Sequence, residues 1–132
     1  MRAASNQSLV ERRDGDEKEA VPLDRLAERI PLLLDRIQQD LLVCAQRRLA
    51  ANTVSANSFD ELRQILEGAT AEKGGGKFVY THIKDDPACD AKAKEIKASI
   101  RCIPLVDEHD GPGKCIITGE PVPHRAVVAK AY

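Results

Sequence analysis

The chain has 132 residues, of which 42% are hydrophobic and 31% charged, and its formal net charge is −1. This length and composition suit one soluble, globular domain with a modest core. Because the net charge is near zero and aromatic residues make up only 3%, the composition argues against a strong stand-alone nucleic-acid binder and against a stacking platform for single strands. No apolar run approaches the ~20 residues of a membrane span, and residues 1–8 lack the apolar core of a secretory signal. We therefore expect a cytoplasmic protein with reduced cysteines.

The first part of the chain changes character near residue 20. Residues 1–20 are polar and charge-rich, which on their own predicts a disordered leader. Apolar residues then recur at steps of three and four from Leu23 to Leu41, which predicts a long amphipathic helix with Pro22 in its first turn. Pro31 lies inside this pattern. Because proline lacks a backbone donor and its ring clashes with the preceding turn, we expect a kink or break there, at about 3 kcal/mol if the helix is forced straight.

A second helix has clear start and stop signals. Ser58 and Glu61 have capping-box spacing, in which the hydroxyl accepts from a backbone N–H and the glutamate reaches back, and Gly68 supplies the end. The glycines at 74–76 form a flexible connection into a strand over 77–83. They do not make a phosphate-binding loop, because Ala71 stands where that motif needs glycine and Phe78 where it needs a hydroxyl.

The remainder predicts one more helix and several strands. Asp86-Pro87 is typical of a helix start, and the apolar spacing places Cys89 on the buried side. Residues 99–105 alternate as a strand, and 114–118 and 125–131 are expected to pair across the turn at 119–123. The fold class is therefore α+β: a small antiparallel or mixed β-sheet packed by helices and preceded by a long amphipathic helix.

Several short segments carry a resemblance to a known family. They are Gly-Gly-Lys-Phe-Val-Tyr-Thr-His at 75–82, Ser-Ile-Arg-Cys-Ile-Pro at 99–104 and the terminal Ala-Lys-Ala-Tyr at 129–132. Together they resemble the C-terminal end of a class II prolyl-tRNA synthetase of the archaeal/eukaryotic type. Upstream segments, including Arg13–Leu23 and Leu34–Leu41, occur in the family's order, so the resemblance covers roughly Leu9 to Tyr132.

The resemblance implies a division of the chain and a parent activity. Residues 1–20 resemble the exit of an anticodon-binding domain, 21–52 a connecting helix, and 53–132 the C-terminal domain. The parent enzyme would be a homodimeric proline–tRNA ligase that uses ATP and Mg. This chain lacks the class II catalytic sheet, so its expected role is to brace the catalytic and anticodon-binding domains, with proline tRNA bound through the parent. The alternative is a free-standing interaction module that binds a synthetase or tRNA in trans, and whether the chain acts as part of an enzyme stays open.

Four cysteines raise the question of zinc, because related domains often bind a structural ion through a Cys-x4-Cys pair and a later Cys-x2-Cys pair. Cys89 matches the second ligand of the first pair, but the segment 82–85, where its partner should fall, has no cysteine. Cys115 matches the first ligand of the second pair, and Thr118 stands in its partner's place. We expect buried apolar thiols and no zinc. The alternative left open is that His82 or His109 joins Cys89 and Cys115.

The other two cysteines do not extend this set, since Cys102 matches a family position that is not a ligand and Cys44 lies far back on the long helix. Other candidates are the acidic turn at 107–110, His124, and a basic stripe of Lys94, Lys97 and Arg101. We interpret them as solvated or structural positions, and no catalytic residues are assigned.

Tyr132 is the remaining candidate, and its role comes from the resemblance. Related synthetases end on a tyrosine whose carboxylate lies near the active site. The resemblance implies that the ring of Tyr132 anchors the tail while its carboxylate organises groups around the proline or adenylate pocket.

Overall fold

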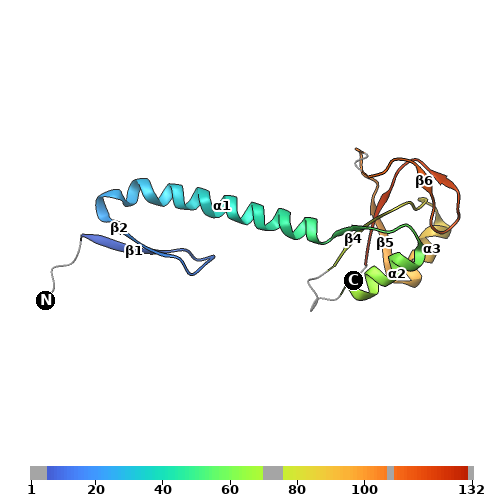
Figure 1. Ribbon diagram of the computed structural model, residues 1–132, viewed down its shortest axis with the longest axis horizontal. Helices are drawn as coiled ribbons and strands as arrows, with labels where there is room; N and C mark the ends of the chain where they lie inside the picture. The colour runs from blue at the N-terminus through green and yellow to red at the C-terminus, as the bar shows by residue number, and fades with distance from the viewer. Residues whose placement is uncertain (1–5, 70–75, 107–108, 131–132) are drawn as a thin grey trace. The chain divides into compact units, whose positions relative to one another are not determined.

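A computed structural model of the chain describes residues 6–69, 76–106 and 109–130. The chain divides into two compact units, Met1–Arg48 and Leu49–Tyr132, both drawn in Figure 1. Each unit contains β-sheet of its own.

The first unit opens with an antiparallel hairpin. Strands β1 (Gln7–Glu11) and β2 (Lys18–Pro22) pair along their whole length, and Val21 is buried. The part of the polar leader that the structure describes is therefore an ordered hairpin. Arg12 binds Asp40 of the following helix at 2.9 Å, which helps to explain how so polar a segment is held.

After the short 3₁₀ turn η1 (Leu23–Arg25), helix α1 runs from Leu26 to Ala51 without interruption. The predicted break at Pro31 is wrong. Pro31 is early in the helix, so its missing N–H removes only one internal hydrogen bond, the one that would reach the carbonyl of Ala27. Pro22 is the last residue of β2 and the N-cap of η1, so it directly precedes the helical stretch and does not lie in the first turn of α1. No residue of α1 is buried in the described structure.

The second unit contains a mixed four-stranded sheet in the order β3-β4-β8-β5. The strands are β3 (Thr53–Ser55), β4 (Phe78–Thr81), β5 (Ala98–Cys102) and β8 (Ala126–Lys130). Strand β3 is parallel to β4, whereas β8 is antiparallel to both of its neighbours. Helices α2 (Phe59–Gly68) and α3 (Pro87–Glu95) share one core with this sheet, so the predicted α+β class is confirmed.

The pairing predicted for the end of the chain is wrong. Segment 125–131 does not pair with 114–118; instead β8 occupies the interior of the sheet, and the short strands β6 (Gly113–Lys114) and β7 (Pro121–Val122) pair with each other. The first four residues of β8 are all buried. Such a continuous apolar run is typical of a strand covered on both faces, which is why it belongs inside the sheet and not in a terminal hairpin.

Both helix starts in this unit follow the sequence. The Ser58 hydroxyl accepts from the Glu61 N–H at 3.2 Å, and the Glu61 carboxylate accepts from the Asn57 N–H at 2.7 Å. The Asp86 carboxylate accepts from the Cys89 N–H at 2.8 Å. These caps satisfy backbone donors that the first helical turn leaves free, so they fix where α2 and α3 begin.

Candidate functional site

Two cysteines far apart in the sequence meet in the core of the second unit. Cys89 lies in the first turn of α3 and is fully buried, Cys115 follows β6 and is 3% exposed, and their Sγ atoms are 3.7 Å apart. Both are free thiols. Cys115 is held by its own backbone, since its N–H donates to the Glu120 carbonyl at 2.7 Å and its carbonyl accepts from the Gly119 N–H at 2.8 Å.

The surroundings of the two sulfurs differ. Burial raises the pKa of Cys115, but hydrogen bonds from the Thr118 hydroxyl and from backbone N–H groups outweigh it and lower the pKa to about 7. One of these donors is the Lys84 N–H, 3.4 Å from the sulfur. Burial raises the pKa of Cys89 to about 12, with Cys115 and Asp86 adding to the effect. When one of the pair ionises, the negative charge therefore rests on Cys115.

His82 is close to the cysteine pair, but its imidazole ring contacts other groups. Its Nε2 is 2.9 Å from the Gly111 carbonyl oxygen. A Cβ built on Gly113 would be 2.5 Å from the imidazole, so this position must be glycine for the ring to lie where it does. The ring of His109 packs on Tyr80, with centroids 3.8 Å apart.

The donor set does not suit a tetrahedral zinc ion. In the described parts of the chain, no three His, Cys, Asp or Glu side chains gather where they could hold a metal. Cys89 and Cys115 supply two thiols, but Thr118, which stands where the resemblance implies a further cysteine, donates its hydroxyl to Cys115. The alternative in which His82 or His109 joins the two cysteines as a zinc ligand lacks support, because both imidazole rings have other contacts. The absence of zinc from the protein itself stays a prediction.

Other predicted residues have structural partners. Lys94 pairs with Asp90 at 2.6 Å, and Arg101 donates to the Lys130 carbonyl at 2.7 Å. Cys44 and Cys102 are exposed. Asp107, Glu108 and Tyr132 lie outside the described residues.

Arg125 is a structural centre that the sequence reasoning missed. The residue is only 6% exposed, and its guanidinium donates to the carbonyls of Ala56 and Tyr80 at 3.0 and 3.2 Å. It also donates to Asn57 Oδ1 at 2.7 Å and to Asp110 Oδ2 at 2.8 Å. The one signal in the sequence is a charged residue directly before the four apolar residues that open β8.

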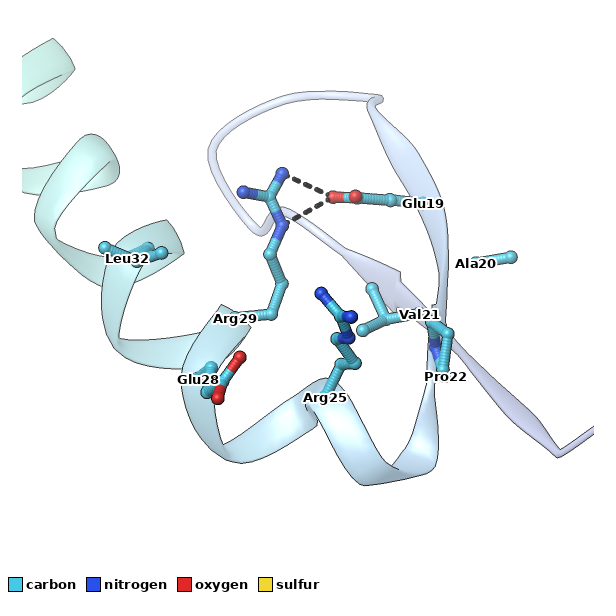
Figure 2. A pocket seen from close by; sticks show the side chains of 8 residues that line it. All are labelled: Glu19, Ala20, Val21, Pro22, Arg25, Glu28, Arg29 and Leu32. Atoms are coloured by element: carbon cyan, nitrogen blue, oxygen red, sulfur yellow. Dashed lines mark hydrogen bonds and ion pairs between the residues drawn. The ribbon is translucent and has the colours of Figure 1, made fainter.

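The first unit has a groove of about 240 Å³ between β2 and the start of the helix, shown in Figure 2. Its lining residues are Glu19, Ala20, Val21, Pro22, Arg25, Glu28, Arg29 and Leu32. Two N–H groups of Arg29 donate to one Glu19 oxygen at 3.1 and 2.7 Å. This ion pair offsets the charges of Glu19 and Arg29, and the other lining residues, which include Arg25 and Glu28, contain no serine, cysteine or histidine nucleophile.

No helix in the part of the chain that the structure describes is long and apolar enough to cross a membrane.

Residues 60–132 match the protein family described as "Prolyl-tRNA synthetase, C-terminal". The chain is 39% identical over 124 residues to a proline–tRNA ligase of Flavobacterium johnsoniae, covering 93% of this chain and 24% of that protein. It is 40% identical over 129 residues to proline–tRNA ligase 2 of Clostridioides difficile, covering 97% of this chain and 25% of that protein. The chain thus spans about a quarter of the length of these relatives.

A solved structure shares the fold. It is the crystal structure of prolyl-tRNA synthetase from Cryptosporidium parvum complexed with halofuginone and AMPPNP, which superposes with a TM-score of 0.82 at 22% identity. The match covers 96% of this chain and 26% of that one.

Proposed function

The chain belongs to the prolyl-tRNA synthetase C-terminal family, and we propose that it serves as the C-terminal structural domain of a proline–tRNA ligase without being catalytic by itself. The observation that carries this proposal is the match of 93% of the chain to about a quarter of a complete ligase. In the proposal, the whole enzyme attaches proline to its tRNA in the cytoplasm with ATP and Mg. The groups that bind these substrates belong to parts of the enzyme other than this chain.

The surface of the first unit supports a bracing role. Leu34, Leu41 and Leu42 of α1 are each 48–59% exposed, and the helical repeat places them on one side of the helix. Burying a leucine side chain contributes roughly 1.5–3 kcal/mol, so these side chains offer substantial binding energy to a neighbouring apolar surface. We assign that surface to the catalytic and anticodon-binding domains of the same synthetase, which as a whole acts as a homodimer.

The division proposed from the sequence fits this role. Residues 1–20 would complete an anticodon-binding domain, 21–52 would connect, and 53–132 would form the C-terminal domain that positions the tail. The proposed boundary between residues 52 and 53 is close to the boundary between the two compact units, which falls after Arg48.

Tyr132 has a specific part in the proposal, resting on the resemblance alone. Its carboxylate would organise groups around the proline or adenylate pocket of the complete ligase. Deleting Tyr132 from that ligase should lower the kcat of aminoacylation at least tenfold and leave the melting temperature of the domain unchanged. Tyr132→Phe keeps the ring and the carboxylate and is the matched control, so it should retain most activity. Unchanged kinetics after the deletion would refute this role.

The domain proposal itself is tested by sequencing the gene upstream of the Met1 codon and by assaying aminoacylation with the chain alone. We expect an open frame that continues into class II catalytic and anticodon-binding sequence, and no activity of the isolated chain. A stop codon just upstream would instead favour the free-standing module, whose partner could then be sought with purified synthetase and with tRNA.

A further inference from the structure

We propose that Cys89 and Cys115 form an intramolecular disulfide when the domain meets a hydroperoxide, so that a reversible covalent crosslink joins α3 to the turn between β6 and β7. This inference goes beyond the proposed function and does not depend on it. It rests on two buried thiols that the fold brings to a sulfur–sulfur distance of 3.7 Å from positions 26 residues apart.

The distance is short enough for bonding without a change of fold. A disulfide has its sulfurs about 2.05 Å apart, so they must move about 1.7 Å closer, which is within the range of side-chain rotation. The backbone on each side is already fixed. Asp86 caps the turn that carries Cys89, and hydrogen bonds to Glu120 and Gly119 hold the turn that carries Cys115.

The chemistry around the two sulfurs separates their roles. Hydrogen bonds from the Lys84 N–H and the Thr118 hydroxyl favour the anionic form of the Cys115 sulfur, which makes it the nucleophile. The Cys89 sulfur interacts instead with Cys115 and with the Asp86 carboxylate, which both favour its protonated form, so Cys89 serves as the resolving thiol.

The reaction balances in two steps. The Cys115 thiolate attacks one oxygen of the hydroperoxide, the O–O bond breaks, and Cys115 becomes a sulfenic acid while the other oxygen leaves and takes up a proton. The Cys89 sulfur then attacks the sulfenic sulfur, its proton leaves with the displaced hydroxide as water, and the S–S bond forms. Two thiols are oxidised by two electrons, and hydrogen peroxide is reduced to two waters.

The test uses the 132-residue chain carrying Cys44→Ser and Cys102→Ser, which removes the two exposed cysteines and leaves the buried pair. The protein is treated with hydrogen peroxide, unfolded in the presence of iodoacetamide, and analysed by intact mass and peptide mapping. We expect a loss of about 2 Da, one peptide pair linked through Cys89 and Cys115, and return of both thiols after dithiothreitol. Closing a loop of this length should lower the unfolding equilibrium constant by roughly 400-fold relative to the reduced protein.

Two results would overturn the proposal. One is recovery of both cysteines as alkylated thiols after peroxide treatment, and the other is oxidation of Cys115 to a sulfinic or sulfonic acid with no linked peptide. The matched variant Cys89→Ala in the same background removes the resolving thiol, so a sulfenic acid should accumulate on Cys115 and be trapped by dimedone. If that variant does not fold, the peptide map of the parent protein still decides the question.

Discussion

The buried guanidinium of Arg125 should be the largest single polar contribution to the stability of the second unit. It ties together three segments of the chain: Ala56 and Asn57 before α2, Tyr80 in β4, and Asp110 in the loop before β6. Replacing it with methionine, which keeps much of the length and loses every donor, leaves the Ala56 carbonyl and the Asn57 amide oxygen without this donor. The Tyr80 carbonyl keeps a second bond, from the Ala56 N–H at 3.0 Å.

The magnitude follows from counting which acceptors lose their partner inside the protein. Hydrogen bonds to charged groups contribute about 1.5–3 kcal/mol each, but they do not add fully, so Arg125→Met should cost about 3–5 kcal/mol of unfolding free energy. The Nε of Arg125 is buried with no partner in the described structure, which reduces the net contribution and favours the lower half of this range.

The ion pair with Asp110 should account for little of this cost. The Asp110 side chain is 70% exposed, and an exposed pair contributes about 1 kcal/mol or less. Asp110→Asn is the matched control, because asparagine has the same shape and tolerates the positive φ of 60° at this position. We therefore expect Asp110→Asn to cost less than 1 kcal/mol.

Native-state hydrogen exchange at the amides of Val79 and Val128 under increasing urea measures both variants, because these buried strand residues report opening of the sheet and not fraying of α1. Equal destabilisation by Arg125→Met and Asp110→Asn would refute the reasoning, since the ion pair would then carry the effect. A cost below 1 kcal/mol for Arg125→Met would refute it as well.

Three further predictions concern the cap, the histidine and the cysteine pair. Ser58→Ala should destabilise the second unit by about 1 kcal/mol in urea unfolding through loss of the α2 cap, and Ser58→Asp should restore most of it. Gly113→Ala should cost about 1–3 kcal/mol because the added methyl displaces His82, and the double variant with His82→Ala should recover part of that cost in a double-mutant cycle. Because folding lowers the pKa of Cys115 from near 9 to about 7, its stabilisation is complete above pH 9 and is lost as the pH falls toward 7, so the melting temperature should rise by roughly 10 °C between pH 7 and 9. Thr118→Val removes a donor to the sulfur and should flatten that rise, whereas an unchanged slope would contradict the assignment; Cys89, with its pKa raised to about 12, opposes the trend only above pH 9.

The candidate site was partly visible in the sequence. The resemblance singled out Cys89 and Cys115, and the helix pattern placed Cys89 on the buried side, which the structure confirms. The sequence did not predict that the Thr118 hydroxyl would donate to Cys115, or that the His82 ring would contact the Gly111 carbonyl. Those contacts depend on side-chain directions within a folded turn, and spacing along the chain does not encode them.

The sequence by itself determined the local features of the fold. The starts of α2 and α3 were predicted correctly because a cap and the N–H that it satisfies are three residues apart, so no distant contact is needed. The continuity of α1 through Pro31 was missed because the loss of one hydrogen bond near a helix start is small beside the bonds that the rest of the helix retains.

Only the tertiary structure decided which strand lies where. The place of β8 between β4 and β5, and the parallel addition of β3, depend on partners dozens of residues away. Arg125 donates a hydrogen bond to Asn57 across 68 residues of sequence, and no local sequence pattern predicts this bond. Helix caps form within one turn of the chain, whereas a sheet and a buried guanidinium take their partners from whichever distant segments the packed core brings within hydrogen-bonding distance.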